Sequence, residues 1–160
     1  MRMLPDQKHF LLAFNKHGVE YLVIGGHAVS EYAEPRATKD LDVFIRTNVE
    51  NGVRVYRALQ EFGAPLENVT AADFQRESKT IFQFGNLPYR VDIFASIPEI
   101  DFEEAWQRRR AGVIDDEVPT QFISREDLIR NKLAVGRHRD LADVEAMREA
   151  NGEDAASRRG

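Results

Sequence analysis

The sequence feature that most constrains the fold is the segment 21–46, in which two apolar stretches flank a pair of glycines. Residues 21–24 are apolar and rich in β-branched and aromatic side chains, which predicts a short buried strand. Gly25 and Gly26 follow, and because neither has a Cβ they allow a tight turn and a close approach of the backbone to a ligand. A helix is predicted to begin there, and its amide groups and dipole favour an anion. From the residues alone, glycines that serve only the turn are an equal alternative.

Asp40 and Asp42 lie two residues apart in the apolar segment that follows, which predicts a second strand. Because side chains alternate across a strand, both carboxylates face one way, about 6–7 Å apart, while Leu41 and Val43 face the other. Asp92 lies in a further predicted strand between apolar neighbours. If that strand lies beside the first, at about 4.8 Å, Asp92 completes a cluster of three carboxylates. Such a cluster needs a positive partner, and Mg²⁺ is the natural one because it binds hard oxygen ligands.

Length and composition indicate one globular domain, expected at residues 1–150, with a polar tail at 151–160 that is predicted to be disordered. The net charge of −5 does not indicate an extensive basic surface, so a large binding surface for duplex DNA is not favoured. The absence of cysteine excludes disulfides and cysteine metal sites. No stretch approaches the roughly 20 apolar residues of a membrane span, and no signal-peptide pattern is present. A cytoplasmic protein is expected.

Hydrophobic periodicity predicts both strands and helices within one domain, and therefore an α+β (α/β) fold. The further predicted strands span 79–84, 89–94 and one or two short segments within 112–122. The predicted helices span 5–16, 48–62, 101–109, a segment between Ser124 and Gly136, and 140–150.

The polar motifs of the chain resemble the signature of the nucleotidyltransferase superfamily typified by DNA polymerase β. The residues that carry the resemblance are Gly25-Gly26, Arg36, Thr38, Asp40, Asp42 and Asp92. In detail they are similar to the small bacterial members, which include lincosamide-type antibiotic nucleotidyltransferases and toxins of the abortive-infection (AbiEii) group. The resemblance covers residues 21–94, and a weaker one at 131–143 is similar to the C-terminal helices of the same enzymes. It implies a nucleotidyltransferase-like fold, with a mixed central β-sheet of about 4–6 strands flanked by helices and with C-terminal helices.

The resemblance also implies roles for the motif residues. Asp40 and Asp42 would hold two Mg²⁺ ions, with Mn²⁺ as an alternative, together with the phosphates of a nucleoside triphosphate such as ATP. Asp92 would hold the ion that activates the acceptor and would receive the acceptor's proton. Gly25-Gly26 and the following helix start would bind the β- and γ-phosphates. The product would be a nucleoside monophosphate attached to an acceptor, with pyrophosphate leaving.

Arg36 and Thr38 lie in the loop before the acidic pair. The guanidinium of Arg36 suits phosphate oxygens, and the alternative is a surface ion pair with Glu31 or Glu34. The hydroxyl of Thr38 is expected to fix the loop around a bound nucleotide.

Lys132 lies in the predicted helix before Gly136. By resemblance it would reach the triphosphate, and an ion pair with Asp127 or Asp140 is an equal alternative.

Three other polar features receive a structural interpretation. His27 is expected to be a bystander at the helix start. The arginine run at 108–110 is typical of a solvated face, although it could contact a nucleic-acid backbone. The acidic residues 115–117 are a rival metal site, but consecutive turn residues point in divergent directions.

These observations favour a nucleotidyltransferase that moves a nucleoside monophosphate to a hydroxyl on a small molecule, an RNA or a protein. A non-catalytic nucleotide- or partner-binding protein on the same scaffold, as half of a toxin–antitoxin pair, is the alternative. A phosphohydrolase is less favoured because the sequence has no His-Asp motif. The sequence leaves open whether a homodimer or an antitoxin partner completes the acceptor site.

Overall fold

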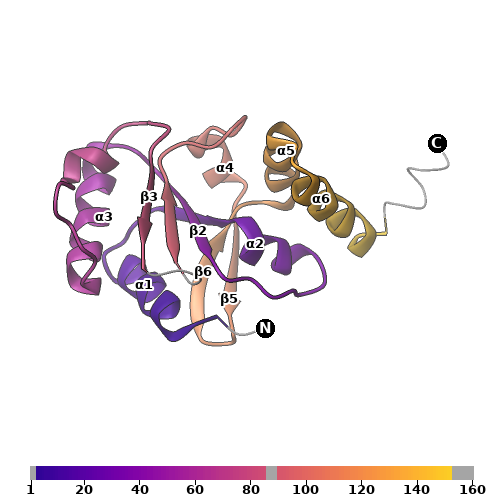
Figure 1. Ribbon diagram of the computed structural model, residues 1–160, viewed down its shortest axis with the longest axis horizontal. Helices are drawn as coiled ribbons and strands as arrows, with labels where there is room; N and C mark the ends of the chain where they lie inside the picture. Colours follow the sequence, from indigo (N-terminus) through magenta and orange to yellow (C-terminus); the bar gives the residue numbers. More distant parts are fainter. Residues whose placement is uncertain (1–2, 86–89, 153–160) are drawn as a thin grey trace.

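The computed structural model describes residues 3–85 and 90–152, and a mixed β-sheet forms its centre (Figure 1). Within these residues the strands are β1 (Tyr21–Ile24), β2 (Leu41–Ile45), β3 (Ile81–Phe84), β4 (Val91–Phe94), β5 (Arg110–Ile114) and β6 (Val118–Phe122). Their order across the sheet is β3-β4-β2-β1-β6-β5. β1 runs antiparallel to β2 and parallel to β6, and β2 is parallel to β4. The edge strands β3 and β5 pair antiparallel with β4 and β6. The predicted α+β class with a mixed sheet is confirmed.

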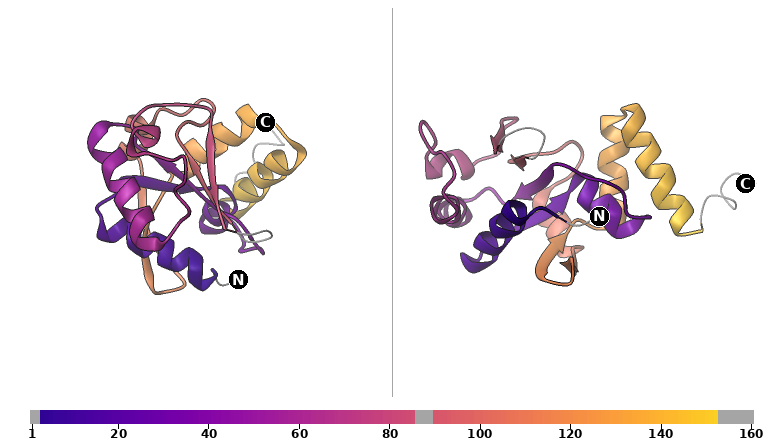
Figure 2. Two further views of the ribbon diagram at one scale, coloured as in Figure 1. Left: turned by 60° about the vertical axis from the view of Figure 1, so that its left-hand side comes forward. Right: turned by 60° about the horizontal axis from the view of Figure 1, so that its bottom comes forward.

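Helices lie on both faces of the sheet. They are α1 (Pro5–Lys16), α2 (Gly25–Tyr32), α3 (Val49–Phe62), α4 (Phe102–Gln107), α5 (Arg125–Val135), α6 (His138–Ala150) and the 3₁₀ helix η1 (Ala71–Phe74). α1 contacts α3, whereas α5 and α6 contact α2 on the opposite side of the molecule (Figures 1 and 2). No helix in the described part of the chain is both long and apolar enough for a membrane span.

Local sequence signals set the ends of several helices. The Asn48 side chain accepts a hydrogen bond from the Asn51 amide and so caps α3. Gly136 adopts a left-handed conformation, with φ of 73°, and ends α5. α6 begins at His138 rather than at Asp140, because the Asp140 carboxylate caps the helix by accepting a bond from the Arg137 amide (3.2 Å).

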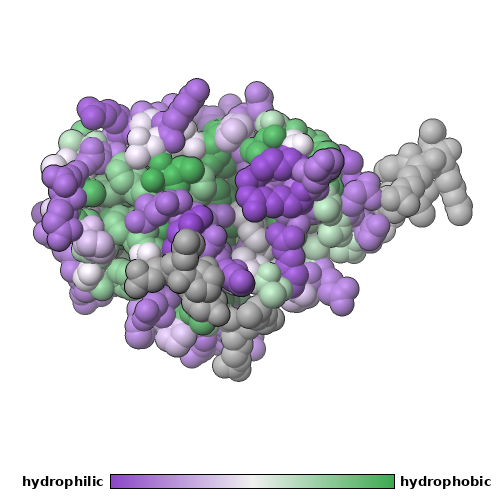
Figure 3. Space-filling model, in the orientation of Figure 1, coloured by the Kyte–Doolittle hydropathy of each residue, from purple (hydrophilic) through white to green (hydrophobic). Residues whose placement is uncertain are grey.

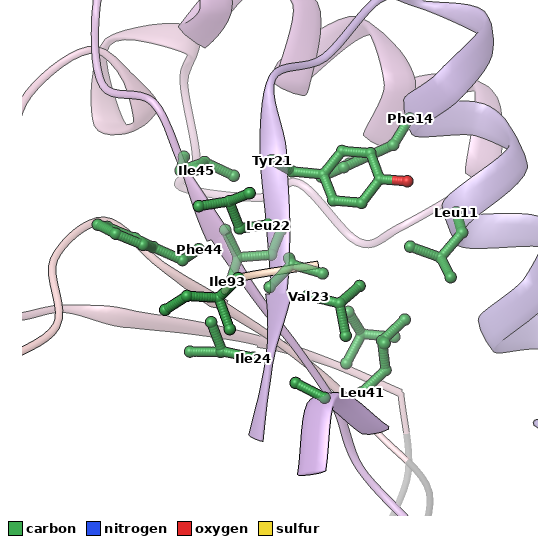
Figure 4. Close-up of a cluster of buried hydrophobic side chains, with 14 of the residues drawn as sticks. Leu11, Phe14, Tyr21, Leu22, Val23, Ile24, Leu41, Phe44, Ile45 and Ile93 are labelled. Atoms are coloured by element: carbon green, nitrogen blue, oxygen red, sulfur yellow. The ribbon is translucent and has the colours of Figure 1, made fainter. Parts of the chain in front are cut away.

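The hydrophobic core lies between the sheet and α1. Phe14 on α1 packs edge-on against Tyr21, with 5.7 Å between ring centroids, and Leu11 lies beside them (Figure 4). On the other face of the sheet Phe44 contacts Phe102 of α4, with ring centroids 5.1 Å apart. The face seen in Figure 3 is hydrophobic in the middle, over β3, and hydrophilic around α5.

The inward face of α3 differs from the predicted one. The sequence predicts Val53, Tyr56, Leu59 and Phe62 inward, but of these only Leu59 is fully buried, together with Val55 and Ala58. The reason is that α3 packs against both α1 and η1. At Gly52, a Cβ would lie only 2.3 Å from the Gln75 side chain next to η1.

Asn51 connects α3 to the ends of two strands. Its Oδ1 accepts a hydrogen bond from the Glu20 amide (2.8 Å), while its Nδ2 donates to the carbonyls of Glu20 (3.0 Å) and Arg46 (2.8 Å). Only 1% of Asn51 is exposed, so these three bonds replace water for backbone groups that flank β1 and β2.

The turn predicted between 84 and 89 and most of the tail at 151–160 fall outside the described residues. The division into a domain at 1–150 and a disordered tail therefore stays a prediction.

We expect Asn51→Ala to lower the free energy of unfolding by about 2–4 kcal/mol, because it leaves buried backbone groups without partners. Urea denaturation measures the loss. Val49→Ala is the matched control, since Val49 is 68% exposed on the same helix, and its effect should stay within about 0.5 kcal/mol. Equal effects of the two substitutions would contradict this role of Asn51.

Candidate active site

Asp42 and Asp92 face each other on neighbouring parallel strands. The register of β2 and β4 pairs the two residues directly, so both side chains leave the same face of the sheet. Asp40 lies just before β2, and there the Leu41 amide donates to the Arg90 carbonyl (2.9 Å), so the strand contact begins at this point. The predicted adjacency of the two strands is confirmed.

Burial and mutual repulsion shape the protonation of this pair. Burial, followed by the charges of Asp92 and Asp40, raises the pKa of Asp42 to about 7. The charge of Lys132 acts in the opposite direction. Burial also raises the pKa of Asp92, and the neighbouring guanidinium of Arg90 opposes this effect. The pair thus lacks enough positive charge to hold both groups ionised at neutral pH.

The chemistry of these side chains fits a hard divalent cation. Asp40 Oδ1 and Asp42 Oδ1 are buried and have no hydrogen-bond partner, so each offers a free oxygen ligand. Across residues 3–85 and 90–152, however, no three His, Cys, Asp or Glu side chains already form a group that could hold a metal ion. The guanidinium of Arg90 lies between Asp92 (Nε to Oδ1, 3.0 Å) and Asp40 (Nη2 to Oδ2, 3.7 Å). The predicted three-carboxylate metal site therefore stays a prediction.

Gly25 and Gly26 leave space for the side chains of Asp42 and Thr38. A Cβ at Gly25 would lie 2.4 Å from Asp42 Oδ2, and the residue has a φ of +67°. A Cβ at Gly26 would lie 2.7 Å from Thr38 Cγ2. The Thr38 hydroxyl in turn donates to the Arg36 carbonyl (3.3 Å), consistent with a loop-fixing role. The glycine pair at the start of α2 thus lets Asp42 of β2 and Thr38 of the preceding loop approach the helix.

Arg36 and Lys132 come together on one carboxylate of α6. Arg36 binds Asp143 through both terminal nitrogens, at 2.5 and 3.2 Å, and Lys132 Nζ lies 2.9 Å from the same side chain. The alternative raised from the sequence, an ion pair of Arg36 with Glu31 or Glu34, is not the contact that forms here.

Lys132 is also 3.3 Å from Asp140, one of the two partners proposed from the sequence, and its 7% exposure places it inside the protein. Asp140 further binds Arg137 (2.7 Å). Three cations and two carboxylates form this network, so its formal charge is +3 − 2 = +1. Because Lys132 and Arg137 interact electrostatically with Asp42, the network lies beside the acidic pair.

The acidic turn at residues 115–117 serves the structure. Asp115 and Asp116 both have positive φ values, 53° and 57°, in the hairpin between β5 and β6. Lys8 of α1 pairs with Asp115 (3.2 Å) and Glu117 (2.5 Å). These contacts agree with the structural interpretation.

The arginine run is likewise engaged within the protein. Arg108 pairs with Asp127 (3.0 Å), Arg109 lies over the Trp106 ring at 3.9 Å, and Arg110 is 3.4 Å from Glu31.

A glycine turn into a helix, an Asp-x-Asp strand and a third Asp on the adjacent strand together indicate a nucleotidyltransferase. Residues 5–151 match the family described as "Nucleotidyltransferase of unknown function (DUF6036)", and the chain belongs to this family. The protein is therefore a nucleotidyltransferase, as the sequence motifs indicated. No curated protein sequence matches the chain significantly. The resemblance to abortive-infection toxins stays a prediction.

Solved structures share the fold across the whole chain. The lincosamide antibiotic adenylyltransferase LnuA, bound to lincomycin, superimposes with a TM-score of 0.61 at 15% identity, covering 93% of this chain and 98% of its own. ANT(2″)-Ia in complex with adenylyl-2″-tobramycin gives a TM-score of 0.58 at 15% identity, covering 94% of this chain and 95% of its own. At these identities the likeness concerns the fold.

Sequence reasoning missed three polar residues next to the acidic pair: Arg90, Asp143 and Gln7. A signal existed for Asp143, because Asp140 and Asp143 are three residues apart and so share a helix face with each other. Arg90 precedes Asp92 by two residues and so shares its strand face. Gln7, which is 3% exposed and donates to the Lys39 carbonyl (2.7 Å), carried no signal because its partner is backbone.

We expect Gly25→Ala to cost at least about 2 kcal/mol of stability, because it combines an unfavourable φ with a clash against Asp42. Gly18→Ala is the matched control: Gly18 has nearly the same φ (+66°) but open space around the Cβ position, so about 1 kcal/mol is expected. Urea denaturation compares them. In an Asp42→Ala background the excess cost at Gly25 should disappear, and its persistence would show that the clash is not with Asp42.

Burial lowers the pKa of His27 to about 4, from the ordinary 6.5, and its Nε2 is buried without a hydrogen-bond partner. The folded state therefore resists protonation, and stability present above pH 6.5 is lost as the pH falls from 6.5 towards 4. The His27 contribution is up to about 3 kcal/mol. We expect the unfolding free energies of the wild type and His27→Gln to converge, or to cross, over this range. A constant difference would contradict the burial effect, and His9→Gln on the exposed surface of α1 is the control.

Proposed function

We propose that the protein transfers a nucleoside monophosphate from a nucleoside triphosphate to a hydroxyl of an acceptor, in a reaction that depends on Mg²⁺. The observation that carries the proposal is the direct pairing of Asp42 with Asp92, with free oxygens of Asp40 and Asp42 beside the start of α2. A divalent cation bound to these carboxylates would neutralise them and stabilise charge on the phosphates. The family and the shared fold support nucleotide transfer in general.

In this proposal the site residues have separate roles in proton transfer, cation binding and phosphate binding. Asp92 takes the proton of the acceptor hydroxyl, whose oxygen forms a bond to the α-phosphorus of the nucleotide. The bond from that phosphorus to the bridging oxygen breaks, and pyrophosphate leaves. Asp40 and Asp42 would hold the divalent cations, two by the resemblance, which would supply positive charge for the phosphates, and the amides at Gly25 and Gly26 bind phosphate oxygens at the start of α2.

The cationic network beside Asp42 supports a triphosphate site. Lys132 and Arg36 share Asp143, and the network carries one positive charge in excess of its carboxylates. We assign the surplus charge to the β- and γ-phosphates, with Thr38 holding the loop that presents Arg36. This assignment gives Lys132 both roles considered from the sequence, an ion-pair partner and an electrostatic support for the nucleotide.

Small molecules are the acceptor class to test first. LnuA is described with lincomycin bound, and ANT(2″)-Ia with an adenylylated tobramycin, and each matches this chain over nearly its whole length. ATP is accordingly the first nucleotide to test. RNA and protein hydroxyls, and a homodimer or antitoxin partner that completes the acceptor site, are the alternatives if small molecules fail.

We expect ATP to bind with Mg²⁺ present and to bind at least tenfold more weakly after addition of EDTA or in the Asp42→Asn variant, because a cation held by these carboxylates would offset the negative charge of the phosphates. Isothermal titration calorimetry measures both affinities without knowledge of the acceptor. Asp116→Asn is the matched control, since Asp116 is exposed in the acidic turn and asparagine tolerates its positive φ.

A loss of metal-dependent binding in Asp116→Asn but not in Asp42→Asn would move the site to the acidic turn. Absence of binding for all four nucleoside triphosphates would favour the non-catalytic alternative.

A further inference from the structure

Arg90 lies within the acidic site although no nucleotidyltransferase motif of the chain includes it. It precedes Asp92 by two residues, so the two side chains leave the same face of the sheet. Its Nε is 3.0 Å from Asp92 Oδ1, and its Nη2 is 3.7 Å from Asp40 Oδ2. One guanidinium thus bridges two of the three carboxylates assigned to metal binding.

The surroundings hold Arg90 in this position. Its carbonyl accepts bonds from the Leu41 amide (2.9 Å) and from the Gln7 side chain (3.4 Å), which fix the backbone beneath the guanidinium. Within residues 3–85 and 90–152, Asp40 and Asp92 are the carboxylates that pair with it. The side chain is only 28% exposed, so the ion pairs are partly shielded from water and are stronger than surface pairs.

Arg90 and a divalent cation cannot both hold the same carboxylate oxygens. A cation that binds Asp92 Oδ1 and Asp40 Oδ2 has to displace the guanidinium, and a guanidinium left nearby repels it. Because arginine stays charged at all accessible pH values, this competition does not disappear by deprotonation.

We propose that Arg90 is an internal counter-cation that competes with the divalent metal for Asp40 and Asp92 and thereby weakens the binding of free metal. The inference rests on the proposed metal-dependent function. Its consequence is that free cation enters the site poorly, because entry costs two ion pairs. Arg90 is accordingly a positioning residue, which acts on the carboxylates.

The test is a titration of the protein with Mn²⁺ alone, in the absence of nucleotide. Calorimetry and the paramagnetic signal of free Mn²⁺ both measure the affinity. We expect Arg90→Gln to bind Mn²⁺ at least tenfold more tightly than the wild type. Arg90→Lys, which keeps the charge, should stay within about threefold of the wild type, because the competing cation remains. Arg57→Gln, on the exposed surface of α3, removes one positive charge elsewhere and should change the affinity by less than threefold.

A second substitution tests whether the tighter Mn²⁺ binding of Arg90→Gln occurs at Asp92. Adding Asp92→Asn to Arg90→Gln should abolish the tighter binding, because it removes the ligand that Arg90 releases. Urea denaturation confirms that each variant is folded before titration.

The outcomes separate this inference from the proposed function. Unchanged or weaker Mn²⁺ binding in Arg90→Gln, with measurable binding in the wild type, would overturn the role of Arg90 and leave the metal-dependent function in place. Absence of Mn²⁺ binding in every variant, with or without ATP, would overturn both.

Discussion

The structure depends on bringing two carboxylates together on adjacent parallel strands, against their mutual repulsion. Asp42 and Asp92 are opposite each other in register, and burial raises the pKa of Asp42 to about 7. For a carboxyl group this corresponds to about 4 kcal/mol of unfavourable ionisation. Such a cost is typical of a site built for a positively charged or metal-bound ligand rather than for stability.

The elements around the pair act to make this arrangement tolerable. Arg90 places one positive charge between Asp92 and Asp40. The charge of Lys132, which α5 carries into the interior, opposes the rise in the pKa of Asp42. The glycine at position 25 leaves the space that the Asp42 carboxylate occupies. The C-terminal helices contribute to this charge arrangement, because Asp143 and Asp140 of α6 orient Lys132 of α5 and Arg36 of the loop before β2.

Much of the fold could be predicted because its signals are local. The Asn48 cap and the glycine at 136 determine helix ends through contacts within a few residues, and the helices predicted at 48–62 and before Gly136 follow these signals. Asp40 and Asp42 could also be assigned to one sheet face, because alternation in a strand is a property of the backbone. The place of Asp92 beside them depends on the pairing of β2 with β4. The inward face of α3 was only partly predicted, because it depends on η1 and α1, which pack against it from distant parts of the chain.

The sequence by itself determined the strand–glycine–helix unit, the spacing of the acidic residues and the nucleotidyltransferase class, because these are fixed by covalent order and local backbone preferences. Only the tertiary structure decided which charges meet. Arg36 pairs with Asp143, which lies 107 positions later in the sequence, and not with the nearby Glu31 or Glu34. Arg90 bridges Asp40 and Asp92, because parallel pairing of β2 with β4 brings their ends together. Electrostatic partners are selected by distance in space and by exclusion of water, and neither quantity is encoded in local spacing.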